Sequence, residues 1–81
     1  MSVKLDKILE KLKSNSDEDI SELGHQLSDV FDDVSGGKMS KDEVEEVVSD
    51  LRTLLKTSSS KDKVLAASLL ESAVVLILAV V

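Results

Sequence analysis

The stretch Val64–Val81, which reads VLAASLLESAVVLILAVV, decides how this chain folds. It contains one charged residue, Glu71, and two hydroxyls, Ser68 and Ser72, and no side chain from Ala73 onward is polar. Its alanines and leucines favour a helix over a strand, although its end is rich in β-branched residues. A helix that is apolar on nearly every side has to be buried in protein or in lipid. The stretch therefore predicts the central helix of the fold.

Three amphipathic helices are predicted ahead of this stretch. Residues 3–13, 17–34 and 41–56 carry their apolar side chains at the i, i+3, i+4, i+7 spacing of a single helical stripe. With a fourth helix over 61–80, the sequence predicts an all-α fold, a small bundle of four helices with a highly apolar C-terminal helix. The simplest arrangement places this helix centrally and covers it with the other three.

Short polar breaks separate the predicted helices and contain candidate helix caps. Asn15 or Ser16 is expected to cap the second helix, and Ser59 or Ser60 the fourth, because short polar side chains accept hydrogen bonds from free N–H groups at helix starts. The Gly-rich turn before residue 39 is expected to end the second helix through a positive φ.

The third helix has the clearest start. Ser40 and Glu43 have the S-x-x-E spacing of a capping box, in which each side chain accepts a hydrogen bond from the other residue's backbone. Gly24, by contrast, lies inside the predicted second helix, where glycine is unfavourable. A glycine in such a position either marks the close approach of another backbone or has no structural role.

Length and composition bound the architecture and the class of protein. An 81-residue chain has room for one modest core, so we interpret residues 1–81 as a single helical domain. Within it, residues 1–57 are acidic amphipathic helices, 58–63 are a linker and cap, and 64–81 are the apolar helix. The chain has no Cys, which excludes disulfides and thiolate chemistry. Its start lacks the apolar core of a secretory signal, so we expect a cytoplasmic, intracellular protein, with membrane association as an alternative.

Charge and motif content argue against several functions. The net charge of −6 and a single aromatic residue, Phe31, make a nucleic-acid partner improbable, since phosphate backbones need basic surfaces and single strands need stacking rings. The single histidine, His25, lies off the apolar stripe and is expected on the surface. No nucleotide-binding or nucleophile-elbow motif is present, so we expect no enzyme activity and no cofactor.

One segment carries a pattern that is associated with a metal ion. From Asp32, taken as position 1, Gly37 falls at position 6, Met39 at position 8, Ser40 at position 9 and Glu43 at position 12. This segment resembles an EF-hand calcium loop, in which the glycine makes a sharp turn and the last carboxylate binds calcium through both oxygens. The resemblance covers about a sixth of the chain.

The same segment departs from the family at two ligand positions. Val34 and Gly36, at positions 3 and 5, have no side-chain oxygen. Calcium prefers six to eight oxygen ligands, so the resemblance implies a weak site at most. Its candidate ligands are Asp32, the carbonyl of Lys38, Ser40 and Glu43.

The function we expect is a helical structural or interaction protein, without catalysis, that self-associates or docks to a protein partner through its apolar C-terminal helix. An apolar helix end that protrudes from a small bundle is an association surface. The candidate interaction residues are Leu69, Leu70, Val74, Leu76, Ile77, Leu78, Val80 and Val81.

Two alternatives remain open from the sequence. In the first, the chain is a tail-anchored membrane protein with 64–81 in the bilayer, and Glu71 makes a polar contact inside the membrane. In the second, the chain is a soluble regulatory module with the degenerate EF-hand-like loop. In a soluble bundle Glu71 would instead mark the exposed edge of the last helix, together with Ser68 and Ser72.

Overall fold

A computed structural model describes residues 3–80, with the side chain of Val3 left undescribed, and these residues form four helices. In chain order they are α1 (Val3–Lys13), α2 (Glu18–Ser35), α3 (Lys41–Thr57) and α4 (Lys63–Leu78). The predicted all-α bundle is confirmed, and each helix end lies within two residues of its expected position.

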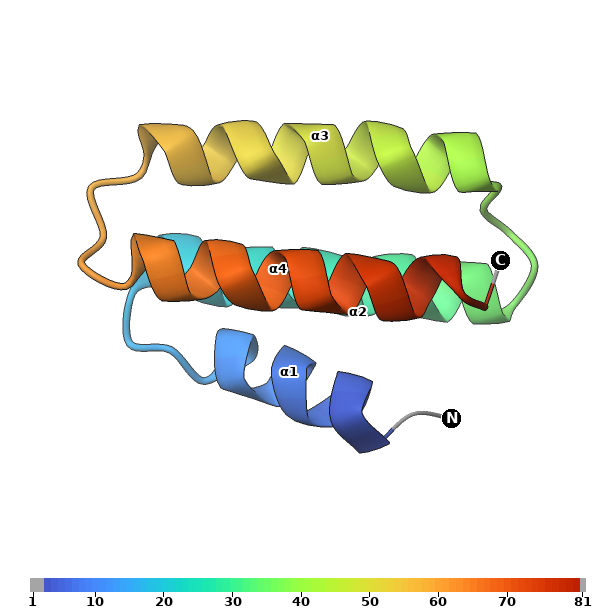
Figure 1. Cartoon of the computed structure of the whole chain (residues 1–81), viewed down its shortest axis with the longest axis horizontal. Helices are drawn as coiled ribbons and strands as arrows, with labels where there is room; N and C mark the ends of the chain where they lie inside the picture. Colours follow the sequence, from blue (N-terminus) through green and yellow to red (C-terminus); the bar gives the residue numbers. More distant parts are fainter. Residues whose placement is uncertain (1–2, 81) are drawn as a thin grey trace.

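Successive helices run in opposite directions, so α2 and α4 point the same way (Figure 1). Both α2 and α4 contact all the other helices, whereas α1 and α3 lie on opposite edges and make no contact with each other within residues 3–80. The molecule measures 34 × 25 × 16 Å. It is therefore a flattened bundle, with α2 and α4 on its two broad sides.

This flattened shape leaves one side of α4 uncovered, which differs from the enclosed helix that the sequence suggested. The side toward the other helices is fully buried at Leu70, Ala73 and Ile77. The opposite side is open, and Val64 there is 82 % exposed. Because α2 lies behind α4 and the other two helices lie at its edges, nothing in the described chain covers its front (Figure 1).

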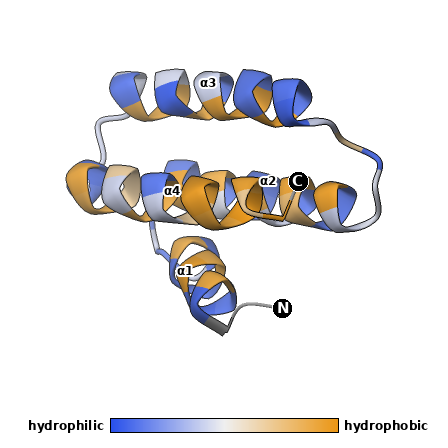
Figure 2. Cartoon of the chain, turned by 45° about the vertical axis from the view of Figure 1, so that its right-hand side comes forward, coloured by the Kyte–Doolittle hydropathy of each residue, from blue (hydrophilic) through white to orange (hydrophobic). Residues whose placement is uncertain are grey.

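The four helices share one hydrophobic core. Figure 2 shows α3 as hydrophobic on the side that faces the bundle and hydrophilic on the other, as its single apolar stripe predicts. The buried apolar side chains come from every helix: Leu5, Ile8, Leu9, Leu12, Ile20, Leu23, Leu27, Val30, Val34, Val44, Val48, Leu51, Leu55, Ala66, Leu70, Ala73, Val74 and Ile77.

The end of α1 packs directly on the backbone of α2 at Gly24. A Cβ atom on Gly24 would lie 2.6 Å from the backbone nitrogen of Lys13 and 2.8 Å from the carbonyl carbon of Leu12. In the same region the hydroxyl of Ser21 donates to the carbonyl of Lys13 at 2.9 Å. The glycine inside the second helix therefore marks a close approach of two backbones.

The turn between α2 and α3 has the geometry that its glycines predict. Gly37 has a φ of +72°, and two backbone bonds close the end of α2, from Lys38 N–H to the Asp33 carbonyl at 2.8 Å and from Gly37 N–H to the Val34 carbonyl at 3.1 Å. This pair is the Schellman pattern, which satisfies carbonyls that the helix leaves free.

The predicted capping box at the start of α3 is confirmed. Glu43 N–H donates to the Ser40 hydroxyl at 3.3 Å, and Ser40 N–H donates to the Glu43 carboxylate at 3.1 Å. The hydroxyl and carboxylate therefore satisfy two N–H groups that have no partner within the helix.

The predicted caps of α2 and α4 are wrong by one to three residues. Asp17 caps α2 by accepting from Asp19 N–H at 3.0 Å. Asp62 occupies the cap position of α4 without making a side-chain cap bond. Its carboxylate instead accepts from the side-chain amide of Asn15 at 3.1 Å, so a contact between distant loops replaces the local cap.

We expect Gly24→Ala to destabilise the fold although alanine favours helix. The added Cβ would clash with the α1 backbone, and forced repacking of this kind costs about 1–3 kcal/mol. The matched control is His25→Ala, on the next residue, whose side chain is exposed. Urea denaturation followed by circular dichroism measures both. A Gly24→Ala protein as stable as His25→Ala would contradict the close packing.

Candidate interaction surface

All the large apolar side chains that are more than half exposed in the described chain come from the open side of α4 and its C-terminal extension. They are Val64, Val75, Leu65 and Val80, with exposed fractions of 82 %, 69 %, 57 % and 54 %. The smaller side chains of Ser68, Ser72 and Ala79 lie between them and are also exposed. We call these seven residues the outer face of α4.

Helix geometry explains why the members of this face that lie within α4 share one side, while Val80 follows the end of the helix. Ser68, Ser72, Val75 and Ala79 follow one another at spacings of four, three and four residues, which keeps them on one face of an α-helix. The buried residues of α4 follow a similar spacing on the opposite side. The apolar sequence of α4 is therefore divided between the core of the chain and its surface.

The structure divides the predicted interaction residues in the same way. Leu70, Val74 and Ile77 lie in the core of the chain itself, and Val80 lies on the outer face. Leu69, Leu76 and Leu78 are partly buried against the core. Val81 lies outside the described residues.

Three exposed residues, Val64, Leu65 and Val75, are not among the predicted interaction residues. A signal for them was present, because Ser68 and Ser72 mark the side of α4 that meets water. Positions three or four residues away from a solvated serine lie on the same side of a helix. Applied to Ser68 and Ser72, this rule includes Val64, Leu65 and Val75, and it also includes the partly buried Leu69 and Leu76.

Glu71 lies at the edge of the outer face and pairs with α3. Its two carboxylate oxygens accept from Arg52, at 2.8 Å from Nε and 2.6 Å from an Nη nitrogen. Both side chains are about half exposed, at 48 % for Arg52 and 52 % for Glu71. Glu71 therefore lies at the exposed edge of α4, as expected for a soluble bundle.

The ion pair shifts the proton affinities of both groups. The hydrogen bonds from Arg52 lower the pKa of Glu71 below its ordinary value of 4.5, and partial desolvation opposes that shift. The same hydrogen bonds raise the pKa of Arg52. Glu71 is therefore ionised at physiological pH, and the positive charge of Arg52 balances its negative charge.

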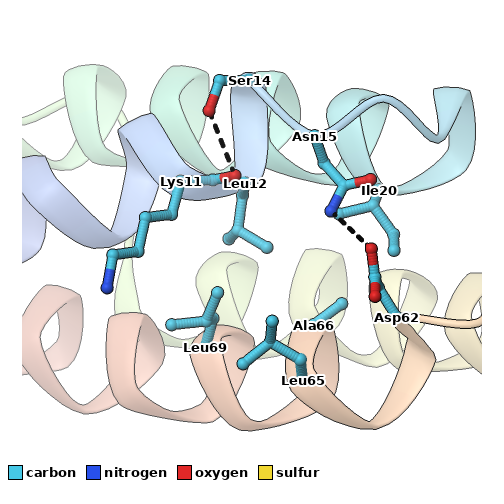
Figure 3. A pocket seen from close by; sticks show the side chains of 9 residues that line it. All are labelled: Lys11, Leu12, Ser14, Asn15, Ile20, Asp62, Leu65, Ala66 and Leu69. Atoms are coloured by element: carbon cyan, nitrogen blue, oxygen red, sulfur yellow. Dashed lines mark hydrogen bonds between the residues drawn. The ribbon is translucent and has the colours of Figure 1, made fainter.

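A cavity of about 350 Å³ lies beside the outer face, between α4 and the end of α1. In Figure 3, Leu12 points from α1 toward Leu65 and Leu69 of α4, and the hydrogen bond between Asn15 and Asp62 closes one end. Leu12 is buried and Leu65 is exposed, so the cavity connects the core to the outer face. It has room for a side chain of another molecule.

The candidate calcium segment has another local role in this structure. Asp32 lies within the last turns of α2, and its carbonyl accepts from Gly36 N–H at 3.0 Å. The hydroxyl of Ser40 and the carboxylate of Glu43 are engaged in the capping box. Within residues 3–80 no three acidic or histidine side chains gather in a way that could hold a metal ion.

Among the helices that the structure describes, none combines the length and the hydropathy needed to cross a bilayer. Comparison with protein-family models, with characterised proteins and with solved structures finds no match to this chain. Inferences about function therefore rest on the geometry of the chain itself.

We expect the Arg52–Glu71 pair to make a small, pH-dependent contribution to stability. Because the folded pKa of Glu71 is lowered, the contribution is present above pH 4.5, the ordinary pKa, and is lost as pH falls through the folded value. Glu71→Gln should lower the unfolding free energy by less than about 1 kcal/mol at neutral pH, since the pair is half exposed.

Denaturation of the wild type and of Glu71→Gln at neutral pH and over a series of decreasing pH below 4.5, with low and high salt, measures this contribution. The control is Glu45→Gln, an exposed glutamate of α3. If the deficit of Glu71→Gln persisted undiminished at the acidic pH, the pair would not be its cause.

Proposed function

We propose that this protein is a helical building block, without catalytic activity, that self-associates through the outer face of α4. The observation that carries the proposal is the gathering of the four most exposed large apolar side chains on that one face. The largest exposed apolar patch on a small protein often marks an interaction site.

The remaining surface supports a specific association rather than non-specific aggregation. The outward sides of α1, α2 and α3 are dominated by lysine, aspartate and glutamate, and the whole chain has a net charge of −6. A net charge of one sign disfavours random contacts between copies. The outer face of α4 carries only uncharged side chains. Two copies that meet through this face therefore avoid the cost of removing charged groups from water.

The area available predicts a reversible association. Two outer faces would contribute eight large apolar side chains, and their partial burial provides on the order of 10 kcal/mol. Loss of translational and rotational freedom costs about 4–15 kcal/mol. Because the two terms are similar, we expect assemblies that form and dissociate as the protein concentration changes.

We expect Val64→Lys/Val75→Lys to abolish the assembly and to leave the fold intact. Both wild-type side chains are mostly exposed, at 82 % and 69 %, so lysine fits in the monomer, but two charges on each copy would have to be desolvated between copies. Light scattering over a concentration series measures the mass, and circular dichroism measures helicity.

Two variants serve as controls for this experiment. Ser49→Lys adds a charge on the exposed side of α3 and should leave the mass of the assembly unchanged. Ile77→Lys places a charge in the core and should unfold the chain. A wild-type chain that keeps a mass of 8.7 kDa up to its solubility limit would overturn the proposal.

A further inference from the structure

We infer that two copies pair through α4 in inverted, antiparallel orientation about a two-fold axis near Ser72. This inference rests on the proposed function and adds the orientation, the register and the identity of the occupant, which is a second copy of this chain. Four features of the described structure support it.

The first feature is a pair of heptad-like seams along α4. The buried residues Ala66, Leu70, Ala73 and Ile77 recur at spacings of four, three and four residues. A second series starts one residue before the first, keeps the same spacing and has one more member at its end. α4 therefore has two neighbouring lines of residues with the spacing of helix-packing contacts. This second series, the outer seam, consists of Leu65, Leu69, Ser72, Leu76 and Ala79.

The outer seam is less covered than the buried one. Leu65, Ser72 and Ala79 are exposed, and Leu69 and Leu76 are only partly buried. The spacing of alternating three and four residues is the one by which helices pack along their length. The seam borders α1, whose Leu12 points toward Leu65 and Leu69. Its exposed members Leu65, Ser72 and Ala79 recur every seven residues, as in a helix-packing surface, and face away from the core.

The second feature is that large and small residues are distributed unevenly along the outer seam. An inverted copy centred on Ser72 places Leu65 opposite Ala79 of the second copy and brings the two small Ser72 side chains together. Leu69 then lies beside the region of Val75 and Leu76 of the second copy. A parallel copy would instead place each residue opposite the same residue of the second copy, which leaves a gap between the two small Ala79 side chains. The inverted arrangement closes as a two-fold dimer.

The third feature is the charge at the two ends of α4. Lys56 and Lys61 are exposed where α3 ends and α4 begins, and Asp62 there is bonded to Asn15. The opposite end of α4 has no basic residue in its last turn and lies near the end of α2 (Figure 1). The free carbonyls there carry partial negative charge.

The end of α2 adds negative charge at the same end of the molecule. Asp29 and Asp32 are exposed in its last turns. Lys38 also lies at this end, and the acidic start of α2 lies beside the lysines at the other end, as the bond from Ser58 to Asp19 shows. The contrast between the two ends is therefore small, and an inverted copy brings the lysines toward the more acidic end twice, whereas a parallel copy would bring like ends together. Charge therefore favours the same orientation as the side-chain sizes.

The fourth feature is the cavity between α1 and α4. It opens beside Leu65 and Leu69, and Lys11 lies at its rim. In the inverted register, the exposed Val75 of the second copy lies opposite Leu69. The cavity of about 350 Å³ can accept such a side chain, and filling it would remove apolar surface from water.

The experiment uses the absence of cysteine from the full chain. Single-cysteine variants Leu65→Cys, Ser72→Cys and Ala79→Cys are oxidised mildly and analysed on non-reducing gels, after light scattering has established the mass of each. We expect Ser72→Cys to form disulfide-linked dimers. Leu65→Cys alone should remain uncrosslinked, since two such positions in inverted helices are about 20 Å apart, beyond disulfide reach.

Mixing Leu65→Cys with Ala79→Cys should then give the mixed dimer. The control is Ser49→Cys on the exposed side of α3, which should not crosslink. Self-crosslinking of Leu65→Cys in an assembled sample would overturn the inverted orientation and leave the proposed self-association standing. Assembly without any crosslink in α4 would refute both, as would a wild type that stays monomeric.

Discussion

The side chains of Leu70, Ala73 and Ile77 lose all contact with water because three charged helices pack around one half of α4. This burial holds the bundle together, since each amphipathic helix presents its single apolar stripe to the same region. An isolated short helix such as α1 is marginal in water, so its structure depends on this packing. The close contact of α1 with Gly24 then sets how near the helices approach.

The same packing creates the exposed face. Three helices arranged as in this flattened bundle cover only part of the circumference of a fourth, and α1 has only 11 residues. The uncovered part of α4 meets water through Ser68, Ser72 and Glu71, but also through Val64 and Val75. The excess of apolar surface beyond what the monomer can bury is the physical basis of the proposed assembly.

Local signals in the sequence predicted local features well. The capping box of Ser40 and Glu43 and the turn at Gly37 depend on neighbouring residues, and the structure confirms them. It also confirms the ends of the four helices to within two residues. The caps of α2 and α4 were predicted wrongly. Asn15 is bonded to Asp62, which is distant in sequence, and no local pattern shows that bond. Three residues of the segment that resembles a calcium loop, Gly37, Ser40 and Glu43, form this turn and this capping box.

The sequence by itself determined that the chain is helical, where its helices lie and that its last helix carries more apolar side chains than one contact surface needs. Only the tertiary structure decided which of them are buried. Leu70 and Val75 are both large apolar residues of α4, yet one lies in the core and the other on the surface. The reason is physical: hydrophobicity is a property of each side chain, whereas burial depends on which directions around α4 the other three helices occupy.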